Sequence, residues 1–276
     1  VVETGDTALS LEGDDEKKQE REGMFFNWSA LEDMPGKEED QGKRRRKRKR
    51  WIWAGVVAVV LAAICFLIVK NQKEVSLSNA GITDVTSVLS KLRYAETLDL
   101  SWNNINDISP LSNLTDLREL DLHFNKINDI SPLSNLTNLS TLHLYQNEIN
   151  DISILSGLTG LSELALGENE ISDISVLSGL TGLSKLYLNE NRIEDISVLS
   201  NLTNLSSLFL GTNQISHLSA LSSLTELTYL DLSDNKITDI SPLSSLTNLK
   251  ELKLSGNPIT DRSPLDALPF TCEITW

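Results

Sequence analysis

The sequence predicts an α/β-type repeat solenoid preceded by one transmembrane α-helix. In the expected horseshoe, short parallel strands line a concave β-sheet, and 3₁₀ or loop segments form the outer face. Two observations support this prediction. A block of the form L-x-L-x-x-N-x-I recurs eight times with a constant spacing of 22 residues. Upstream of it, 19 uncharged residues follow a run of eight basic residues. The fold class therefore follows from periodicity and charge pattern.

Residues 1–42 form the first segment, with 13 acidic and 4 basic residues and no apolar periodicity. Such a composition does not bury enough apolar surface to fold, so we expect an acidic, disordered cytoplasmic tail. The exception is "GMFFNWSALEDM" at residues 23–34. It is either a docking motif for a cytosolic partner or a few apolar residues in a flexible tail.

Residues 43–50, "KRRRKRKR", and residues 51–69, "WIWAGVVAVVLAAICFLIV", predict a membrane anchor. A helix of this apolar length extends about 28 Å, close to the hydrocarbon thickness of a bilayer. A basic flank marks the cytoplasmic side, and Trp51 and Trp53 suit the interface. We expect a basic juxtamembrane segment, a single-pass helix with the N-terminus inside, and a linker at residues 70–74.

Residues 75–276 carry the repeats, which begin with an imperfect copy at Val75 and end with the strand-like "EITW". In each block two leucines alternate with polar residues and turn inward from a short strand. The Asn that follows has donors and an acceptor for backbone groups left unpaired at the bend, within its coil and toward the next. These residues are Asn103, Asn125, Asn147, Asn169, Asn191, Asn213, Asn235 and Asn257. A fixed period of this type is the signature of a leucine-rich repeat solenoid.

The segment "NDISPLSNLT", found at 106–115 and again at 128–137, belongs to the outer side. Ser109 and Pro110 form a helix-start pair, in which the Ser hydroxyl is expected to cap free N–H groups. Asp107 has a counterpart in almost every coil. A catalytic group is needed only once, so we interpret the Asp column as structural, with Asx-type bonds to local N–H groups. A calcium-binding ladder is the alternative.

The repeats, for example "LTNLSTLHLYQNEINDISILSGL", resemble those of bacterial internalins, the cell-surface leucine-rich repeat proteins of Gram-positive bacteria. The same repeat subtype occurs in the 22-residue repeats of a protein-phosphatase-1 regulatory subunit. The resemblance covers residues 75–276 and implies the fold, with binding of cell-surface proteins on the concave face. Within residues 1–276 we recognise no separate helical cap, immunoglobulin-like module or sorting motif of the family, so we do not expect a role in host invasion from the resemblance.

The variable strand positions are the predicted ligand-binding site. Six aromatic residues fall at outward positions, whereas within residues 75–268 only Tyr94 falls elsewhere. The same positions carry eleven acidic and five basic residues. Aromatic residues dominate interface hot spots, although strands also favour them for their own packing. The predicted site residues are Trp102, Phe124, His143, Tyr145, Glu168, Tyr187, Glu190, Phe209 and Tyr229.

These features predict a membrane-tethered, extracytoplasmic binding protein of a Gram-positive bacterium. We expect a protein or cell-surface ligand with basic patches and exclude nucleic acid as a partner. No catalytic constellation, metal site or cofactor motif is predicted. His123 and His143, with Asp121 beside His143, form at most a loose metal site, for which the spacing and the number of ligands are poor. Two alternatives stay open: a receptor-like signalling protein whose cytoplasmic effector lies upstream of Val1, and an intracellular scaffold resembling a phosphatase regulator.

Overall fold

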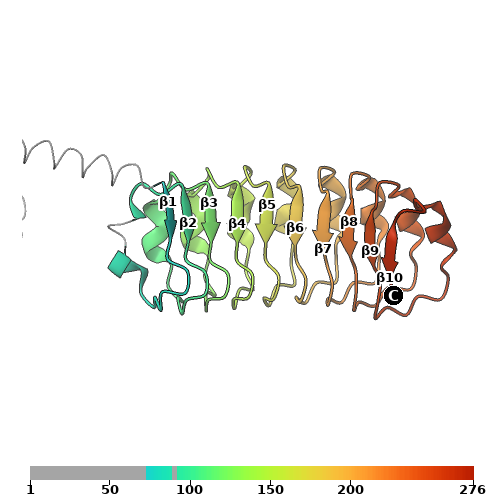
Figure 1. Cartoon of the computed structure of the whole chain (residues 1–276), viewed down its shortest axis with the longest axis horizontal. Helices are drawn as coiled ribbons and strands as arrows, with labels where there is room; N and C mark the ends of the chain where they lie inside the picture. Colours follow the sequence, from blue (N-terminus) through green and yellow to red (C-terminus); the bar gives the residue numbers. More distant parts are fainter. Residues whose placement is uncertain (1–72, 89–91) are drawn as a thin grey trace, which may run out of the picture. The chain divides into compact units, whose positions relative to one another are not determined.

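In the part of the chain that the structure describes, ten short parallel strands form one sheet in which each strand lies next to its neighbour in the chain (Figure 1). The computed structural model describes residues 73–88 and 92–276. The strands are β1 (Glu74–Ser76), β2 (Thr97–Asp99), β3 (Glu119–Asp121), β4 (Thr141–His143), β5 (Glu163–Ala165), β6 (Lys185–Tyr187), β7 (Ser207–Phe209), β8 (Tyr229–Asp231), β9 (Glu251–Lys253) and β10 (Glu273–Thr275). The predicted repeat solenoid with a parallel sheet is confirmed.

The constant period fixes the register of the sheet. Leu98 pairs with Leu120, and Leu120 pairs with Leu142, so equivalent letters of successive repeats stand side by side. β1 pairs with β2 in the same way, Val75 with Leu98, because the one additional residue lies outside the strands. Because side chains alternate across a strand, every central leucine points to the same interior.

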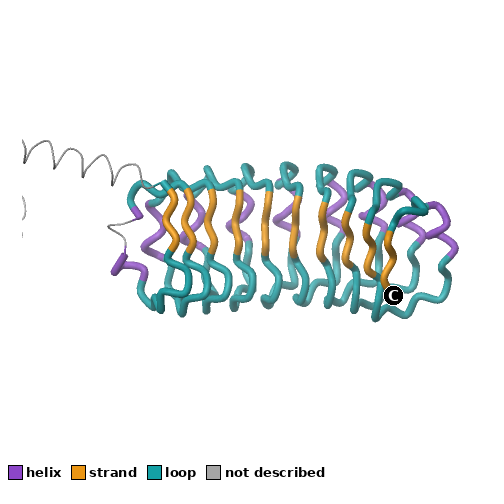
Figure 2. The backbone as a smooth tube through the Cα atoms, viewed as in Figure 1, coloured by secondary structure: helices purple, strands orange, loops and turns teal. Residues whose placement is uncertain are grey.

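The return half of each coil contains a short 3₁₀-helix on the side of the coil away from the strands (Figure 2). These helices are η2 (Val85–Val88), η3 (Ser109–Asn113), η4 (Ser131–Asn135), η5 (Ser153–Gly157), η6 (Ser175–Gly179), η7 (Ser197–Asn201), η8 (Ser219–Ser223), η9 (Ser241–Ser245) and η10 (Ser263–Ala267). The 3₁₀ form of the outer side is as predicted.

The capping role expected for Ser109 is wrong. The N-cap position of η3 is Ile108, no side chain makes a cap bond there, and Pro110 lies in the first turn. Instead, Oδ1 of Asp107 accepts a hydrogen bond of 2.8 Å from the backbone N–H of Ser109. A carboxylate placed two residues earlier reaches this N–H more directly than the hydroxyl of the residue itself. The Asp column is therefore the capping device of the outer side.

The interior is aliphatic throughout the described coils. In one coil, Leu98, Leu100, Ile105, Ile108 and Leu111 are all at most 1% exposed. Each coil adds an equivalent set to one continuous core. Burial of a leucine or isoleucine side chain stabilises the folded state by about 1.5–3 kcal/mol, so stacked coils stabilise each other and an isolated coil does not fold.

The asparagine ladder connects neighbouring coils, and Asn169 illustrates it. Its Nδ2 donates to the carbonyls of Leu144 and Leu166, at 3.0 and 3.1 Å. Its Oδ1 accepts the N–H of Ile149 at 3.0 Å. Leu144 and Ile149 belong to the preceding coil, so the inter-coil bonds run backward along the chain and not toward the following coil. The first coil has no earlier coil to bind, and there Ala80 replaces the Asn.

Within residues 73–88 and 92–276, no helix has the length and apolar character needed to cross a bilayer. The predicted tail, basic segment and membrane helix, residues 1–69, lie outside the described residues, as do residues 70–72 of the predicted linker.

Candidate ligand-binding face

The exposed side of the sheet, together with the turn that follows each strand, forms a surface that we call the strand face. The residues at its outward positions flank the inward leucines, as Asp99 and Ser101 flank Leu100. Trp102 is 53% exposed, and the other predicted aromatic residues are half-buried. All nine predicted residues lie on this face, as the repeat register predicts: Trp102, Phe124, His143, Tyr145, Glu168, Tyr187, Glu190, Phe209 and Tyr229.

The turn after each strand places one residue per coil in the left-handed region of backbone conformation. Trp102 and Phe124 have φ of 55° and 53°, and Glu168 and Glu190 have φ of 49° and 54°. In the last regular coil this position is Gly256, with φ 72°. A non-glycine residue in this conformation costs about 1–2 kcal/mol. Bulky and acidic side chains nevertheless occupy this position at the edge of the strand face, although its backbone conformation favours glycine.

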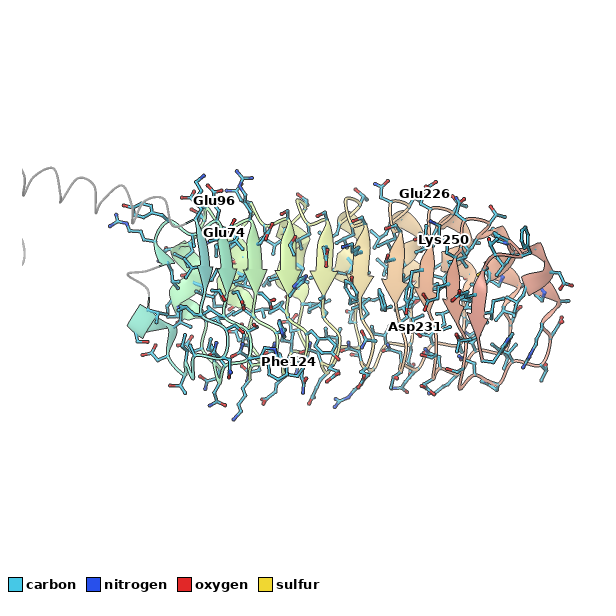
Figure 3. The ribbon with its side chains drawn as sticks, in the orientation of Figure 1. Glu74, Glu96, Phe124, Glu226, Asp231 and Lys250 are labelled. Atoms are coloured by element: carbon cyan, nitrogen blue, oxygen red, sulfur yellow. The ribbon has the colours of Figure 1, made fainter. Side chains whose placement is uncertain are left out.

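Four aromatic rings of the first coils form a packed group, which we call the first aromatic cluster: Trp102, His123, Phe124 and Tyr145. Trp102 and Phe124 stack with centroids 3.7 Å apart and planes 9° from parallel. His123 contacts Phe124 edge to face at 5.4 Å, and Tyr145 lies 5.8 Å from Phe124. Phe124 lies in the turn at the end of β3 (Figure 3). Such contacts fix the ring orientations before any ligand is bound.

A second aromatic cluster occupies the later coils and consists of Tyr187, Phe209 and Tyr229. Tyr187 stacks on Phe209 at 4.5 Å, and Phe209 stacks on Tyr229 at 4.4 Å. Nζ of Lys253 lies 5.2 Å from the centroid of Tyr229, within the range of a cation–π contact. The cluster is a row of rings that follows the stacking direction of the coils.

The coil of β5 separates the two clusters, and it carries the small residues Ala165 and Gly167 at the positions equivalent to Tyr187 and Tyr145. The ring of Tyr145 lies over Gly167, since a Cβ atom there would stand 2.8 Å from Tyr145 Cδ2 and 2.7 Å from Asn189 Oδ1. The Tyr145 hydroxyl donates a hydrogen bond to the Glu168 carboxylate. Burial and this carboxylate raise the pKa of Tyr145 far above its usual value, so the phenol stays protonated. Tyr145 thereby fixes the position of Glu168.

A row of charges crosses β3 to β6. Asp121 Oδ1 lies 2.5 Å from His123 Nδ1, and Asp121 Oδ2 lies 3.6 Å from His143 Nδ1. His143 Nε2 lies 3.2 Å from Glu163 Oε1, and the other Glu163 oxygen binds Lys185 at 2.9 Å. The hydrogen bond with Asp121 raises the pKa of His143 against the opposing effect of burial, with a smaller contribution from Glu163.

This row was only partly predicted from the sequence. We expected His123 and His143 to form a loose pair with Asp121 beside His143. The structure instead places Asp121 against both imidazoles and adds Glu163 as the second partner of His143. The in-register pairing of Asp121 with His143 followed from the repeat period, whereas the second contact depends on side-chain conformation. Among the described residues no group of three or more His, Cys, Asp or Glu is arranged to hold a metal ion.

Several acidic residues of the strand face have no cationic partner among the described residues, and Glu168 and Glu190 of adjacent coils are two of them. In the described part of the chain neither has a Lys, Arg or His nitrogen within 4.0 Å. Burial and the neighbouring Glu168 carboxylate raise the pKa of Glu190. By comparison, Glu170 in the same region binds Arg192 at 3.2 Å. The two carboxylates therefore leave local negative charge beside the aromatic clusters.

The fold and this face define the class of the protein. A family model of leucine-rich repeats in two copies matches residues 96–135, 137–179, 181–223 and 225–267. The chain belongs to the leucine-rich repeat family. A search among curated proteins gives no match.

Three solved structures show what the chain is similar to. Internalin C2 from Listeria monocytogenes is 37% identical, with a TM-score of 0.65; the match covers 68% of this chain and 82% of internalin C2. The functional domain of InlJ, also from Listeria monocytogenes, is 28% identical with a TM-score of 0.58, covering 72% and 48%. The ectodomain of the plant membrane receptor kinase GASSHO1/SCHENGEN3 from Arabidopsis thaliana, in complex with CASPARIAN STRIP INTEGRITY FACTOR 2, is 27% identical, with a TM-score of 0.59 and coverage of 67% and 24%.

Proposed function

We propose that the chain is a membrane-tethered, extracytoplasmic binding protein that recognises a protein or cell-surface ligand through its strand face. The observation that carries the proposal is the pair of aromatic clusters on an exposed surface of a protein whose interior contains only aliphatic side chains in the described coils. The rings are packed against each other and not into the core, so the solenoid does not need their volume. Large aromatic side chains of this kind are the usual anchors of protein interfaces.

Preorganisation strengthens this argument. The stacked rings at 3.7 Å and 4.5 Å hold each other in one orientation, so a ligand meets a surface that is already ordered. Binding then costs less side-chain entropy than it does on a mobile surface. The plant receptor ectodomain, which shares the repeat fold, is in complex with a ligand, which favours a binding role for such a scaffold.

The charge of the strand face indicates the kind of partner. Its outward positions carry eleven acidic and five basic residues, and the whole chain has a net charge of −15. An acidic surface attracts a partner with basic patches and repels the phosphates of nucleic acid.

The tether and its orientation are supported by the sequence and by the relatives. The basic residues 43–50 precede the apolar residues 51–69 and mark the cytoplasmic flank, which leaves the repeats on the outer side. The similarity to Listeria internalins fits an extracytoplasmic location of the repeats.

Site-specific photo-crosslinking in living cells tests the proposed function. Replacing Phe209 by benzoylphenylalanine keeps an aromatic ring in the second cluster and puts a photoreactive group on the strand face. The matched control carries the same group at Ser178, which is exposed on the outer side in η6. We expect a discrete crosslinked protein from position 209 and none from position 178. A partner captured only from position 178 would assign the binding role to the outer side.

A further inference from the structure

The imidazole of His143 lies between two carboxylates of the strand face. Its Nδ1 is 3.6 Å from Oδ2 of Asp121 on β3, and its Nε2 is 3.2 Å from Oε1 of Glu163 on β5. A neutral imidazole has one N–H group and one lone pair, whereas an imidazolium has two N–H groups. A neutral ring in this position turns its lone pair toward one of the carboxylates, so the observed geometry fits the charged form of His143.

On the side of β3, two further titratable groups lie close to His143. Oδ1 of Asp121 also contacts Nδ1 of His123, at 2.5 Å, so the two imidazoles share one carboxylate. Glu119 precedes Asp121 by two residues and lies on the same side of β3. In the turn after β4, Tyr145 keeps its proton because burial raises the pKa of its phenol. The groups of β3 that carry negative charge near His143 are therefore carboxylates.

On the side of β5, the second oxygen of Glu163 binds Nζ of Lys185 at 2.9 Å. Asp121, Glu163 and Lys185 together have a formal charge of −1 when His143 is neutral and of zero when it is charged. The side chains of His143 and Asp121 are 30% and 27% exposed, so solvent screens this change less than it does on an open surface. The hydrogen bond with Asp121 raises the pKa of His143 above its ordinary value, which brings the change of charge close to neutral pH.

We propose that protonation of His143 switches the affinity of the strand face for its partner, so that a partner with basic patches binds more tightly when His143 is neutral than when it is charged. The inference rests on the proposed function and adds a regulatory device to it. His123 contacts Asp121 and also packs against the ring of Phe124 at 5.4 Å, so the charge row lies beside the first aromatic cluster. A basic group of a ligand that packs on these rings meets the charge of the row.

NMR measures the switch without the partner. Ala165 pairs with His143 in the register of β4 and β5, so its methyl group reports on the charge of the row. The full chain, with labelled alanine methyl groups, is held in nanodiscs of phosphatidylcholine, and the methyl relaxation caused by a cationic nitroxide is divided by that caused by a neutral one. Between about pH 5.5 and about pH 8.5 we expect this ratio to rise about twofold at Ala165, because negative charge concentrates the cationic probe. Ala220 in η8 on the outer side, 7% exposed against 9% for Ala165, is expected to show no such rise.

Two variants separate His143 from the other groups that titrate. His143→Gln removes the switch, and the matched control His217→Gln removes an exposed imidazole from the outer side. Circular dichroism checks that both proteins are folded. The rise at Ala165 is expected in His217→Gln and absent from His143→Gln. No rise in the parent, or an equal rise in His143→Gln, overturns the inference and leaves the proposed function standing.

Photo-crosslinking from position 209, in cells resuspended at the same two pH values, measures the effect on the partner. We expect the yield of crosslinked protein to be about threefold higher at the higher pH in the parent and in His217→Gln, and to be the same at both values in His143→Gln. An equal dependence on pH in the parent and in His143→Gln overturns the inference alone. A parent that gives no crosslinked protein at either pH contradicts the proposed function and the inference together.

Discussion

Replacing Asn169 by Ala tests how the coils are held together. The side chain makes four hydrogen bonds to backbone groups. After its removal, some of these backbone groups still have another hydrogen-bond partner and others do not. The carbonyl of Leu144 also accepts from Nδ2 of Asn147 at 3.1 Å, and the carbonyl of Leu166 also accepts from Nδ2 of Asn191 at 3.0 Å. These two acceptors keep a partner, and so does the carbonyl of Gly167, the third acceptor, which also accepts the N–H of Gln146 at 2.9 Å. The N–H of Ile149, in a part-buried position, bonds only to Oδ1 of Asn169 and loses this partner.

The expected cost follows from that one orphaned donor. A buried N–H without a partner costs about 1–3 kcal/mol, and we expect a loss of about 2 kcal/mol in the free energy of unfolding. For a domain of this size, that corresponds to a fall of about 4–8 °C in the melting temperature if the repeats unfold as one unit. Because the lost bond joins two coils, the effect falls on one interface of the stack.

Urea unfolding followed by circular dichroism measures the loss, and hydrogen exchange locates it at the amide of Ile149. The control is Asn204→Ala, whose exposed side chain donates one bond of 2.9 Å to the carbonyl of Thr181 that water replaces. It is expected to change stability by less than about 0.5 kcal/mol. A loss below about 0.5 kcal/mol for Asn169→Ala itself, or equal losses for the two variants, would refute the ladder argument.

Three further predictions concern the outer side, the charge row and the membrane. Asp173→Asn is expected to destabilise much less than Asn169→Ala, because an amide oxygen still accepts the Ser175 N–H; a larger loss that appears only with calcium would support a metal ladder instead. Folding raises the pKa of His143, so the charged imidazole stabilises the fold fully below about pH 6, and this stabilisation declines as pH rises through the raised pKa. Urea unfolding is expected to show that the free energy of unfolding falls by less than about 1 kcal/mol by about pH 8, and that His143→Gln lacks this fall. An equal fall in His143→Gln would assign the effect to another group. Protease added to wall-stripped cells is expected to cut the repeats and spare residues 1–50, because the N-terminus is expected inside the cell. Replacing Lys and Arg of residues 43–50 by Gln is expected to weaken or invert this N-inside orientation. Protected repeats with a cleaved tail would contradict it.

The 22-residue period was enough to predict most of the fold. A spacing of 22 residues dictates which residues pair across the sheet, as in Leu98 with Leu120, and the two-residue alternation dictates which side chains are buried. The capping of η3 was predicted in part: the Asx-type bond from a local N–H to Asp107 is confirmed, whereas the capping role of the Ser109 hydroxyl is wrong. Only the backbone path decides that the Asp oxygen reaches the N–H of Ser109.

The candidate site was predictable in position but not in its contacts. The repeat register placed Tyr187 and Phe209 next to each other, and the structure shows them stacked. The Tyr145 ring lies over Gly167 and bonds to the carboxylate of Glu168 in the next coil, a conformation that depends on rotamers and on the missing Cβ of Gly167. Sequence period carries no information on such choices, so it did not predict that Glu168 is held in place.

The affinity of the crosslinked partner for Tyr145→Ala/Tyr187→Ala/Phe209→Ala tests the central claim, that the strand face is the binding surface. The three rings lie outside the aliphatic core, so their removal opens no core cavity. Each lost contact between rings costs about 0.5–1.5 kcal/mol, so the variant is expected to remain folded. We predict that its Kd rises at least about thirtyfold, because a central aromatic anchor contributes about 2 kcal/mol or more. Ser134→Ala/Ser178→Ala, on the outer side, is expected to bind like the parent. An unchanged Kd for the folded triple variant would contradict the account.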